Sequence, residues 1–347
     1  MAKTVKIGFI GTGGIGRYQM EKLSKVADVQ ILAAADVSKD NLEKAKAQYK
    51  IEHVFTDWRK LVEMPELDAV SVCTPNGMHC EPTVAALKAG KHVLVEKPLA
   101  MNAKEGTQMV KAATASGKLL QIGFQWRFSP GAQFIRKHVA AGDLGDIVYV
   151  RCQALRRRGI PNWGVFGRKE LQGGGPMIDI GVHILEMAHY MIGKPQPVSA
   201  RGSCYTYLGN KKSESLCAWN HWDHKTYTVE DLATGYITFA DGASLVIESS
   251  FAAHIDKDVF TVQIMGTKGG ATFDPLMVFT DQRGYMVNVQ TPYAGTGDMF
   301  EHKMRHFVEC VRDGKECEAP GTDGLMVQKM LDGIYASAAS HREVRIR

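Results

Sequence analysis

Short apolar runs alternate with amphipathic segments over the first third of the chain. This pattern is typical of repeated strand–helix units that build a parallel sheet. The amphipathic segments predict helices near residues 14–26, 39–49, 79–89 and 103–117, and Gly90 and Gly117 stand where two of them should end in a left-handed residue. The apolar runs predict strands at Lys6–Ile10, Gln30–Asp36, Ala69–Thr74, His92–Glu96 and Leu119–Gly123.

The pattern changes after about Phe124, where longer segments alternate between apolar and polar residues. Such alternation predicts half-buried antiparallel strands. We therefore expect a second domain over residues 124–347, of α+β class, with one large, open, mostly antiparallel sheet. A predicted helix at Thr322–Ser340 can pack back on the first domain, residues 1–123. The clearest strands are Ile147–Ala154, Leu232–Phe239, Ala243–Phe251 and Thr261–Met265, with a tight turn at residues 240–242.

An open sheet with one face not covered by its own helices needs a partner. We expect a homodimer or homotetramer that associates through this face. Composition adds little, because 347 residues with 45% hydrophobic and 23% charged residues are ordinary for a globular protein. The net charge of +5 is spread along the chain, so nucleic acid is not an expected partner. Arg156-Arg157-Arg158 is too short to change this, and a solvated loop or subunit contact is favoured over a role toward an anionic substrate.

The seven cysteines are odd in number and lack C-x-x-C spacing, so neither a disulfide framework nor a zinc knuckle is expected. The segment His221-Trp222-Asp223-His224 carries metal-capable side chains but no fourth ligand at a recognisable spacing, which favours a substrate-rim or interface loop. No metal is predicted. The first apolar stretch is too short for a signal peptide, and no stretch reaches the ~18–20 apolar residues of a membrane span. We expect a soluble, cytoplasmic protein.

Gly11-Thr12-Gly13-Gly14-Ile15-Gly16 fits G-x-G-x-x-G directly after a predicted strand and at the start of a predicted helix. There, glycines permit a tight turn and let backbone N–H groups approach a pyrophosphate at the helix N-terminus. The alternative is a glycine turn without a ligand. We predict a first domain of the α/β Rossmann type that binds a dinucleotide.

Two further segments belong to the predicted cofactor site. Asp36, at the end of the second strand, can accept hydrogen bonds from both ribose hydroxyls and would repel a 2′-phosphate, which favours NAD over NADP. It can equally serve as a charge at the next helix start. Thr74-Pro75-Asn76-Gly77-Met78-His79 follows the third strand at the same sheet edge, so Thr74, Pro75, Asn76 and His79 are cofactor-contact candidates, or simply a strand-to-helix turn.

Candidate catalytic groups follow in two places. Lys97, between Glu96 and Pro98, comes directly after a predicted strand, where the proline holds it in extended geometry. A fixed ammonium there can donate to a substrate hydroxyl and stabilise a developing alkoxide. Asp179 and His183 stand four residues apart after Gly173-Gly174-Gly175-Pro176, so a helix would place both on one face. The alternative is that Asp179 caps the helix and His183 is a buried structural histidine.

These motifs, in this order and at this spacing, resemble those of the Gfo/Idh/MocA family of oxidoreductases over essentially the whole chain. The resemblance implies that Lys97 binds the reacting hydroxyl, and that Asp179 and His183 position a sugar ring and exchange its proton. It also implies that Glu96 lies near the nicotinamide ribose, while Arg127 and Trp163 border the nicotinamide or the substrate.

The resulting expectation is an NAD-dependent dehydrogenase or reductase that acts on a secondary hydroxyl or ketone of a cyclic polyol, sugar or sugar derivative. In the proposed reaction His183 removes the hydroxyl proton, for which the ordinary imidazole pKa of about 6.5 is suited. One alternative is a glycosidase or lyase that retains its cofactor and oxidises the sugar transiently. Another is a non-catalytic dinucleotide sensor, against which the presence of Lys97, Asp179 and His183 counts.

Overall fold

The computed structural model describes residues 3–217, 219 and 221–346. The chain forms two compact units, which are described separately. Unit 1 comprises the residues up to Phe128 together with Gly297–Leu325, and unit 2 comprises Ser129–Thr296 together with the residues from Met326 onward. In the described part of the chain, no helix combines the length and the apolar character that crossing a membrane requires.

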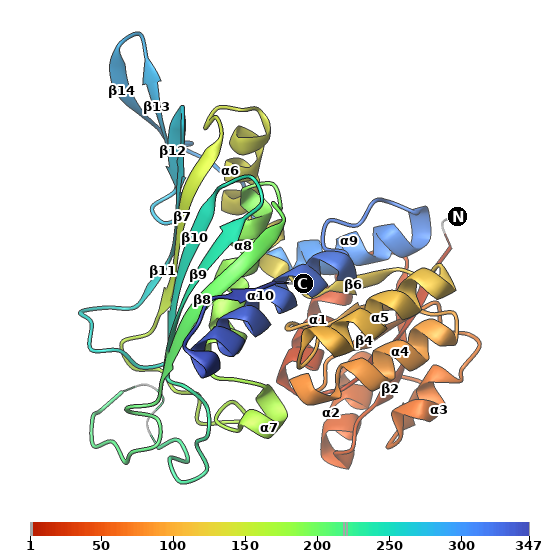
Figure 1. The fold of residues 1–347 in the computed structure, drawn as a ribbon. Helices are drawn as coiled ribbons and strands as arrows, with labels where there is room; N and C mark the ends of the chain where they lie inside the picture. Colours follow the sequence, from red (N-terminus) through yellow and green to blue (C-terminus); the bar gives the residue numbers. More distant parts are fainter. Residues whose placement is uncertain (1–2, 218, 220, 347) are drawn as a thin grey trace. The chain divides into compact units, whose positions relative to one another are not determined.

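Unit 1 contains a six-stranded parallel sheet in the order β3-β2-β1-β4-β5-β6 (Figure 1). This confirms the Rossmann-type prediction, with each predicted strand found within two residues of its expected bounds. Strand β3 and helix α3 were not predicted, because both are too short to show a period. The strands are β1 Val5–Ile10, β2 Val29–Ala35, β3 His53–Phe55, β4 Ala69–Val72, β5 His92–Val95 and β6 Leu120–Ile122.

Local sequence explains the ends of several unit 1 helices. The Ser38 hydroxyl accepts the Asn41 N–H at the start of α2, and the Asn102 side chain accepts the Glu105 N–H at the start of α5. Gly117 ends α5 in the left-handed conformation, as predicted. The helices are α1 Gly14–Leu23, α2 Lys39–Tyr49, α3 Trp58–Val62, α4 Cys80–Lys88, α5 Ala103–Ser116 and α9 Met299–Asp313, with short turns η1 Asn76–Met78 and η2 Gln125–Phe128.

Helix α9 belongs to unit 1 although it lies far along the chain. Its buried residues Met304, Phe307 and Val308 join the core beneath β1, together with Phe9 and Leu94. Burying such side chains contributes about 1.5–3 kcal/mol each. The sequence predicted no helix at these positions, so this return of the chain to the first sheet is a finding of the structure.

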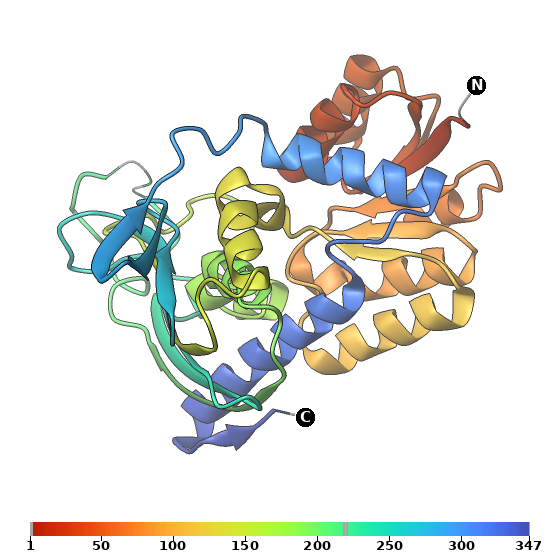
Figure 2. The same cartoon turned by 90° about the horizontal axis from the view of Figure 1, so that it is seen from above.

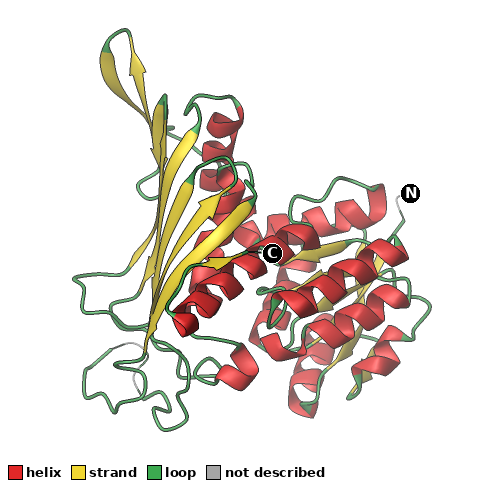
Figure 3. Cartoon of the chain, viewed as in Figure 1, coloured by secondary structure: helices red, strands yellow, loops and turns green. Residues whose placement is uncertain are grey.

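Unit 2 is built on a nine-stranded sheet in the order β14-β13-β12-β11-β7-β10-β9-β8-β15. Figure 3 shows its strands in yellow and its helices in red. The predicted hairpin of β9 and β10 is confirmed, with Gly242 at φ +91° in the turn. The prediction of a mostly antiparallel sheet is confirmed, and one neighbouring pair, β7 and β10, runs parallel. The strands are β7 Ile147–Leu155, β8 Pro197–Tyr205, β9 Leu232–Phe239, β10 Ser244–Ser250, β11 Val259–Gly266, β12 Gly269–Thr272, β13 Met277–Gln282, β14 Tyr285–Val289 and β15 Val344–Arg345.

Helices of unit 2 cover one face of this sheet. Helix α8 packs on β7 and β11, and α6 packs on α8 (Figure 2). Along β9, Ala233, Ile237 and Phe239 are buried while Tyr236 is 44% exposed. The alternation therefore assigns one buried and one open face to the sheet, as the pattern predicted. The remaining helices are α6 Pro130–Ala140, α7 Lys169–Gln172, the π-helical turn η3 Met177–Gly181, α8 Val182–Met191 and α10 Gly321–Ser340, of which unit 2 holds the part after Leu325.

Candidate active site

The predicted glycine-rich loop connects β1 to α1. Gly11 has φ +94°, and a Cβ there would lie 2.6 Å from the Cys73 carbonyl oxygen. A Cβ on Gly16 would overlap the Gly11 carbonyl oxygen. In contrast, Gly13 and Gly14 have no described atom within 4 Å of an added Cβ. Two glycines thus close the turn, and the other two leave the start of α1 open to a ligand.

Asp36 lies directly after β2, beside this loop. Its Oδ2 atom accepts the Thr12 N–H at 2.7 Å and the Thr12 hydroxyl at 2.9 Å, and its Oδ1 atom accepts the Ser38 N–H at 2.9 Å. Because Ser38 caps α2, Asp36 does not itself take the capping position. The carboxylate is instead fixed at the carboxyl end of the sheet.

A cavity of about 350 Å³ opens at this place and is lined by Gly11, Gly13, Asp36, Thr74 and Pro75, among others. Its volume lies at the lower end of known ligand sites. The features required of a dinucleotide site are present: an open helix N-terminus for a pyrophosphate and a fixed carboxylate for a ribose. The residues present therefore fit the predicted cofactor.

Glu96 follows β5 and is buried within a polar network of unit 1. Its Oε1 atom accepts hydrogen bonds from the Gln19 amide and, at 2.8 Å, from the wholly buried Lys303 ammonium. Its Oε2 atom accepts the Lys97 N–H at 3.2 Å. Burial raises the pKa of Glu96, but the neighbouring Lys303 and Lys97 charges outweigh it and hold the pKa below its ordinary value. A charged carboxylate therefore fixes the backbone at Lys97.

His79 ties together two loops at the same sheet edge. Its Nδ1 atom lies 2.8 Å from the Pro98 carbonyl oxygen and its Nε2 atom 2.9 Å from the Thr74 carbonyl oxygen. Burial lowers its pKa, and the two carbonyls oppose that shift. His79 thus anchors the segment that carries Lys97 to the segment that lines the cavity, while Asn76 is buried in η1.

Arg127, in η2, is wholly buried in unit 1. Its Nη1 atom donates to Asp323 Oδ2 at 2.6 Å and to the Glu318 carbonyl oxygen at 2.8 Å. The guanidinium also lies over the Phe124 ring, 5.1 Å from its centroid. These contacts give Arg127 a structural role that the sequence did not predict, because both polar partners lie almost 200 residues further along the chain. Its contact with the cofactor stays a prediction.

In unit 2, Glu230 organises the glycine-rich segment before Asp179. Its carboxylate accepts the Gly175 N–H at 2.9 Å, the Met177 N–H at 3.3 Å and the Tyr335 hydroxyl at 2.7 Å. A Cβ on Gly175 would overlap the Glu230 carbonyl oxygen. The helix start is therefore held by Glu230, and Asp179 lies within the π-helical turn, whose N-cap position is taken by Pro176.

Asp179 and His183 lie on one continuous helical stretch, as expected. Asp179 is buried in the π-helical turn η3, and His183 is partly buried in the first turn of α8. Single π-helical turns occur frequently at functional sites. Arg156 interacts electrostatically with Asp179, which opposes the lowering of the Arg156 pKa by burial. From the sequence, a solvated loop or a subunit contact was favoured for Arg156, and its interaction with Asp179 was not predicted. Lys97 belongs to unit 1, whereas Asp179 and His183 belong to unit 2.

Two clusters of side chains that could bind a metal already make hydrogen bonds within the protein. Within the described residues, ligand atoms of His306, Cys310 and Cys317 lie within 4.8 Å of one another. His306 Nε2 already accepts the Glu318 N–H at 3.0 Å, and hydrogen bonding to Cys317 and His306 lowers the Cys310 pKa to about 5. The spacing had not indicated this cluster. In the other cluster, Asp223 accepts hydrogen bonds from the Lys225 N–H and the Thr226 hydroxyl, so its carboxylate closes a turn.

Both units match known families. Residues 5–124 match the family described as oxidoreductase family, NAD-binding Rossmann fold, and residues 132–272 match the GFO/IDH/MocA C-terminal domain. The chain belongs to the Gfo/Idh/MocA oxidoreductase family. The resemblance noted in the sequence is thereby confirmed, together with the fold class and NAD as the cofactor of the first domain.

Relatives in this family cover nearly the whole chain. The D-glucoside 3-dehydrogenase of Escherichia coli is 33% identical over 99% of this chain and 97% of its own length. The myo-inositol 2-dehydrogenase of Thermotoga maritima is 28% identical over 98% of this chain and 97% of its own length. A solved structure of levoglucosan dehydrogenase in complex with NADH and levoglucosan has a TM-score of 0.86 at 25% identity, with 99% of each chain covered.

Proposed function

We propose that this oxidoreductase transfers a hydride between NAD and a secondary hydroxyl or ketone of a sugar, a sugar derivative or a cyclic polyol. The observation that carries the proposal is the fixed carboxylate of Glu96, which holds the Lys97 backbone in the same unit as the open dinucleotide loop. The activities named for the relatives, on a glucoside, on inositol and on levoglucosan, support the substrate class.

The catalytic roles follow from the chemistry of three side chains. Bound NAD supplies the hydride acceptor. The Lys97 ammonium donates a hydrogen bond to the reacting hydroxyl and stabilises the alkoxide as it forms. His183 accepts the hydroxyl proton, and Asp179 orients the sugar ring or stabilises the imidazolium. In the reducing direction, His183 returns the proton.

We also propose a preference for NAD over NADP. The Asp36 carboxylate is held at the end of β2 by Thr12 and Ser38, facing the cavity that fits the cofactor. A fixed negative charge at this place favours free ribose hydroxyls and repels a 2′-phosphate. Initial rates with NAD and with NADP at equal concentration measure the preference directly, and faster turnover with NADP would contradict it.

The first experiment measures NADH formation with a panel of sugars, cyclitols and glycosides. Lys97→Ala and His183→Ala should each lower kcat by about 10²–10⁴-fold, because each removes a group that acts on the reacting hydroxyl. The exposed residues Lys104 and His53 provide matched controls, and Lys104→Ala and His53→Ala should leave kcat unchanged. Undiminished turnover in both Lys97→Ala and His183→Ala would contradict the assignment. Release of an aglycone without net NADH formation would instead indicate redox-assisted glycoside cleavage.

We further propose that copies of the chain associate through the open face of the unit 2 sheet. By strand register, Met265 pairs with Tyr149 and Tyr236 pairs with Val246, which places these four side chains on one face. Met265 is 45% exposed and Tyr236 is 44% exposed. Exposed apolar side chains gathered on one sheet face favour burial against a second copy.

A further inference from the structure

Loops of unit 2 carry a cluster of aromatic side chains beyond the ends of the central strands. Trp163, between β7 and α7, packs nearly perpendicular to Trp219, with ring centroids 4.8 Å apart, and to Phe166, with centroids 6.1 Å apart. Despite both contacts, Trp163 stays 50% exposed. Nothing in the fold of the sheet requires an indole at this position. A half-exposed aromatic held in place by other rings is typical of a ligand-contacting surface.

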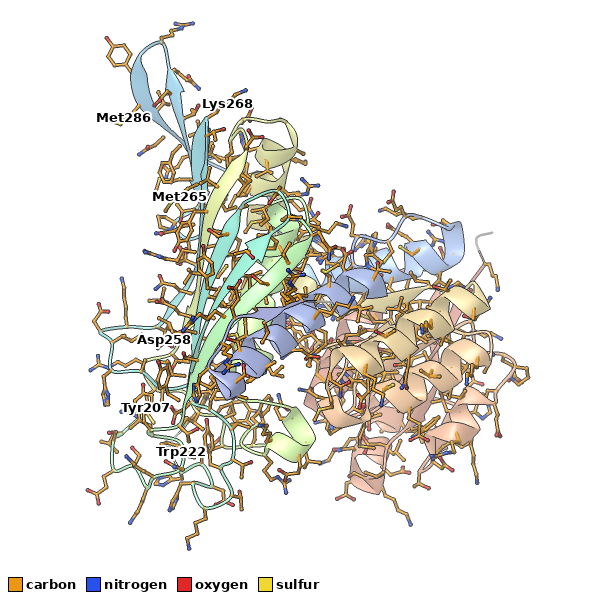
Figure 4. The ribbon with its side chains drawn as sticks, in the orientation of Figure 1. Tyr207, Trp222, Asp258, Met265, Lys268 and Met286 are labelled. Atoms are coloured by element: carbon orange, nitrogen blue, oxygen red, sulfur yellow. The ribbon has the colours of Figure 1, made fainter. Side chains whose placement is uncertain are left out.

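A hollow of about 310 Å³ adjoins Trp163. Trp222 and Tyr227 contribute further aromatic wall, and Asn162, Arg168 and Asp223 contribute an amide, a guanidinium and a carboxylate. Trp222 lies in the loops at the end of the unit 2 sheet (Figure 4). It is fixed, because its indole N–H donates to the Gly209 carbonyl oxygen at 2.7 Å. The volume suits a small ligand, and the polar groups of the lining can orient such a ligand by hydrogen bonds.

The mixture of groups selects the chemistry of the occupant. A sugar ring presents apolar C–H faces and a rim of hydroxyls that both donate and accept hydrogen bonds. The half-exposed Trp163 ring can stack on such a face, while the Asp223 carboxylate accepts and the Arg168 guanidinium donates at the rim. Hydrogen bonds from Thr226 and Lys225 lower the pKa of Asp223, so its negative charge offsets the positive charge of Arg168 in the same lining. An uncharged polyhydroxylated ring therefore fits better than a phosphate or carboxylate ligand.

Arg156 connects this cluster to the catalytic helix of the same unit. Its guanidinium lies over the Trp219 ring, 4.8 Å from the centroid, and interacts electrostatically with Asp179. It is also braced by the Gly159 carbonyl oxygen, to which it donates at 2.9 Å. Arg156 therefore contacts the aromatic cluster and also interacts electrostatically with Asp179 of the same unit.

We propose that Trp163 and Trp222 bound a subsite for the second ring of a glycoside, so that the substrate class is a glycoside or disaccharide and not a free monosaccharide. This inference rests on the proposed function, in which the first ring is oxidised at Asp179 and His183. The oxidised carbon loses its hydrogen as a hydride to NAD, its hydroxyl loses a proton to His183, and the glycosidic bond stays intact. The second ring contributes binding only.

The test compares Trp163→Ala with the unmodified enzyme on methyl glucosides and on the disaccharides maltose and cellobiose. Losing one stacking surface should lower kcat/KM for the disaccharide that the enzyme turns over by about tenfold, since 1.4 kcal/mol corresponds to a factor of ten. The value for the methyl glucoside should change less than twofold. Trp163→Phe should restore most of the loss because it keeps an aromatic ring. Tyr285→Ala, which removes a 75% exposed aromatic from β14 of the same unit, is the matched control and should change neither value.

The outcomes separate the two proposals. If the unmodified enzyme forms NADH with these sugars but Trp163→Ala lowers kcat/KM equally for methyl glucosides and disaccharides, the subsite is overturned and the proposed function stands. If the enzyme forms NADH with none of the sugars, cyclitols and glycosides of the panel, the proposed function fails. Quenching of tryptophan fluorescence by the disaccharides then tests the subsite alone. Quenching that Trp163→Ala abolishes supports the subsite, and the absence of quenching in the unmodified enzyme overturns it.

Discussion

Lys303 is a wholly buried lysine whose ammonium lies 2.8 Å from a carboxylate oxygen of Glu96. Removing one partner of such a pair leaves an uncompensated buried charge, which costs about 3–5 kcal/mol. We expect Lys303→Met to lower the free energy of unfolding at neutral pH by that amount, measured by urea denaturation. Lys315→Met, which removes a lysine with a 54% exposed side chain from a surface pair with Glu309, should cost at most about 1 kcal/mol.

The same pair predicts a dependence on pH with a definite sign. Because the folded pKa of Glu96 lies below its ordinary value, its stabilising contribution is present above the unfolded pKa of about 4.3 and is lost as the pH falls through the folded value. In Lys303→Met the buried Glu96 carboxylate has lost its partner, so it is more readily protonated. Protonation in acid removes the cost of burying its charge. The difference in Tm between the two proteins should therefore narrow below about pH 4.5. A difference that stays constant from pH 7 down to about pH 3 would show that Lys303 acts through packing alone.

At the scale of elements, glycines have two roles in the loop between β1 and α1: some are required by the tight turn, and others leave space for a ligand. A Cβ on Gly16 would overlap the Gly11 carbonyl oxygen, whereas a Cβ on Gly13 would meet no described atom within 4 Å. Gly16→Ala should therefore lower Tm and weaken NAD binding together. Gly13→Ala should keep Tm within about 2 °C, since no contact changes, yet raise the Kd for NAD by about tenfold because its methyl group enters the space left for the pyrophosphate. Differential scanning fluorimetry measures Tm, and calorimetric titration measures the Kd for NAD. Unchanged NAD binding by Gly13→Ala would contradict the prediction that the pyrophosphate lies beside Gly13.

The elements also show why some of the fold was predictable from sequence. Strands β1, β2, β4 and β5 are apolar runs with turn residues at their ends, so their type and their parallel arrangement follow from local pattern. Pairing between distant strands leaves no local trace, so the sequence did not predict that β7 and β10 are parallel neighbours. Strand β3 has three residues, too few to reveal any period.

The sequence indicated some residues of the candidate site but not others. The glycine loop, Asp36 and Lys97 carry their chemistry in consecutive residues, so the sequence indicated them. The residues that hold these groups in place lie far away in the sequence, so no local pattern indicates them. Lys303 lies 207 residues from Glu96, and the partner of Gly175 is Glu230, 55 residues further along. Buried polar groups require partners, but only the folded chain determines which residues these are.

At the scale of the whole molecule, the open face of the unit 2 sheet predicts the state of association. A face that leaves Tyr236 and Met265 nearly half exposed should bury them against a second copy, so we expect a homodimer or homotetramer. A buried charge without a partner disfavours such an interface. Tyr236→Glu and Met265→Glu should therefore shift the mass measured by light scattering toward that of the 38.2 kDa chain.

Lys44→Glu is the matched control for the effect of charge. Lys44 is exposed on α2 of unit 1 and is not part of the unit 2 sheet, so this change should leave the measured mass unaltered. Unfolding must be excluded as the cause of dissociation, because a new charge in a strand can also destabilise the sheet itself. An unchanged β-sheet signal in circular dichroism and an unchanged Tm of the dissociated variants exclude it, since the substituted strands belong to unit 2. A single-chain mass for the unmodified protein at micromolar concentration would mean that the open face serves another purpose.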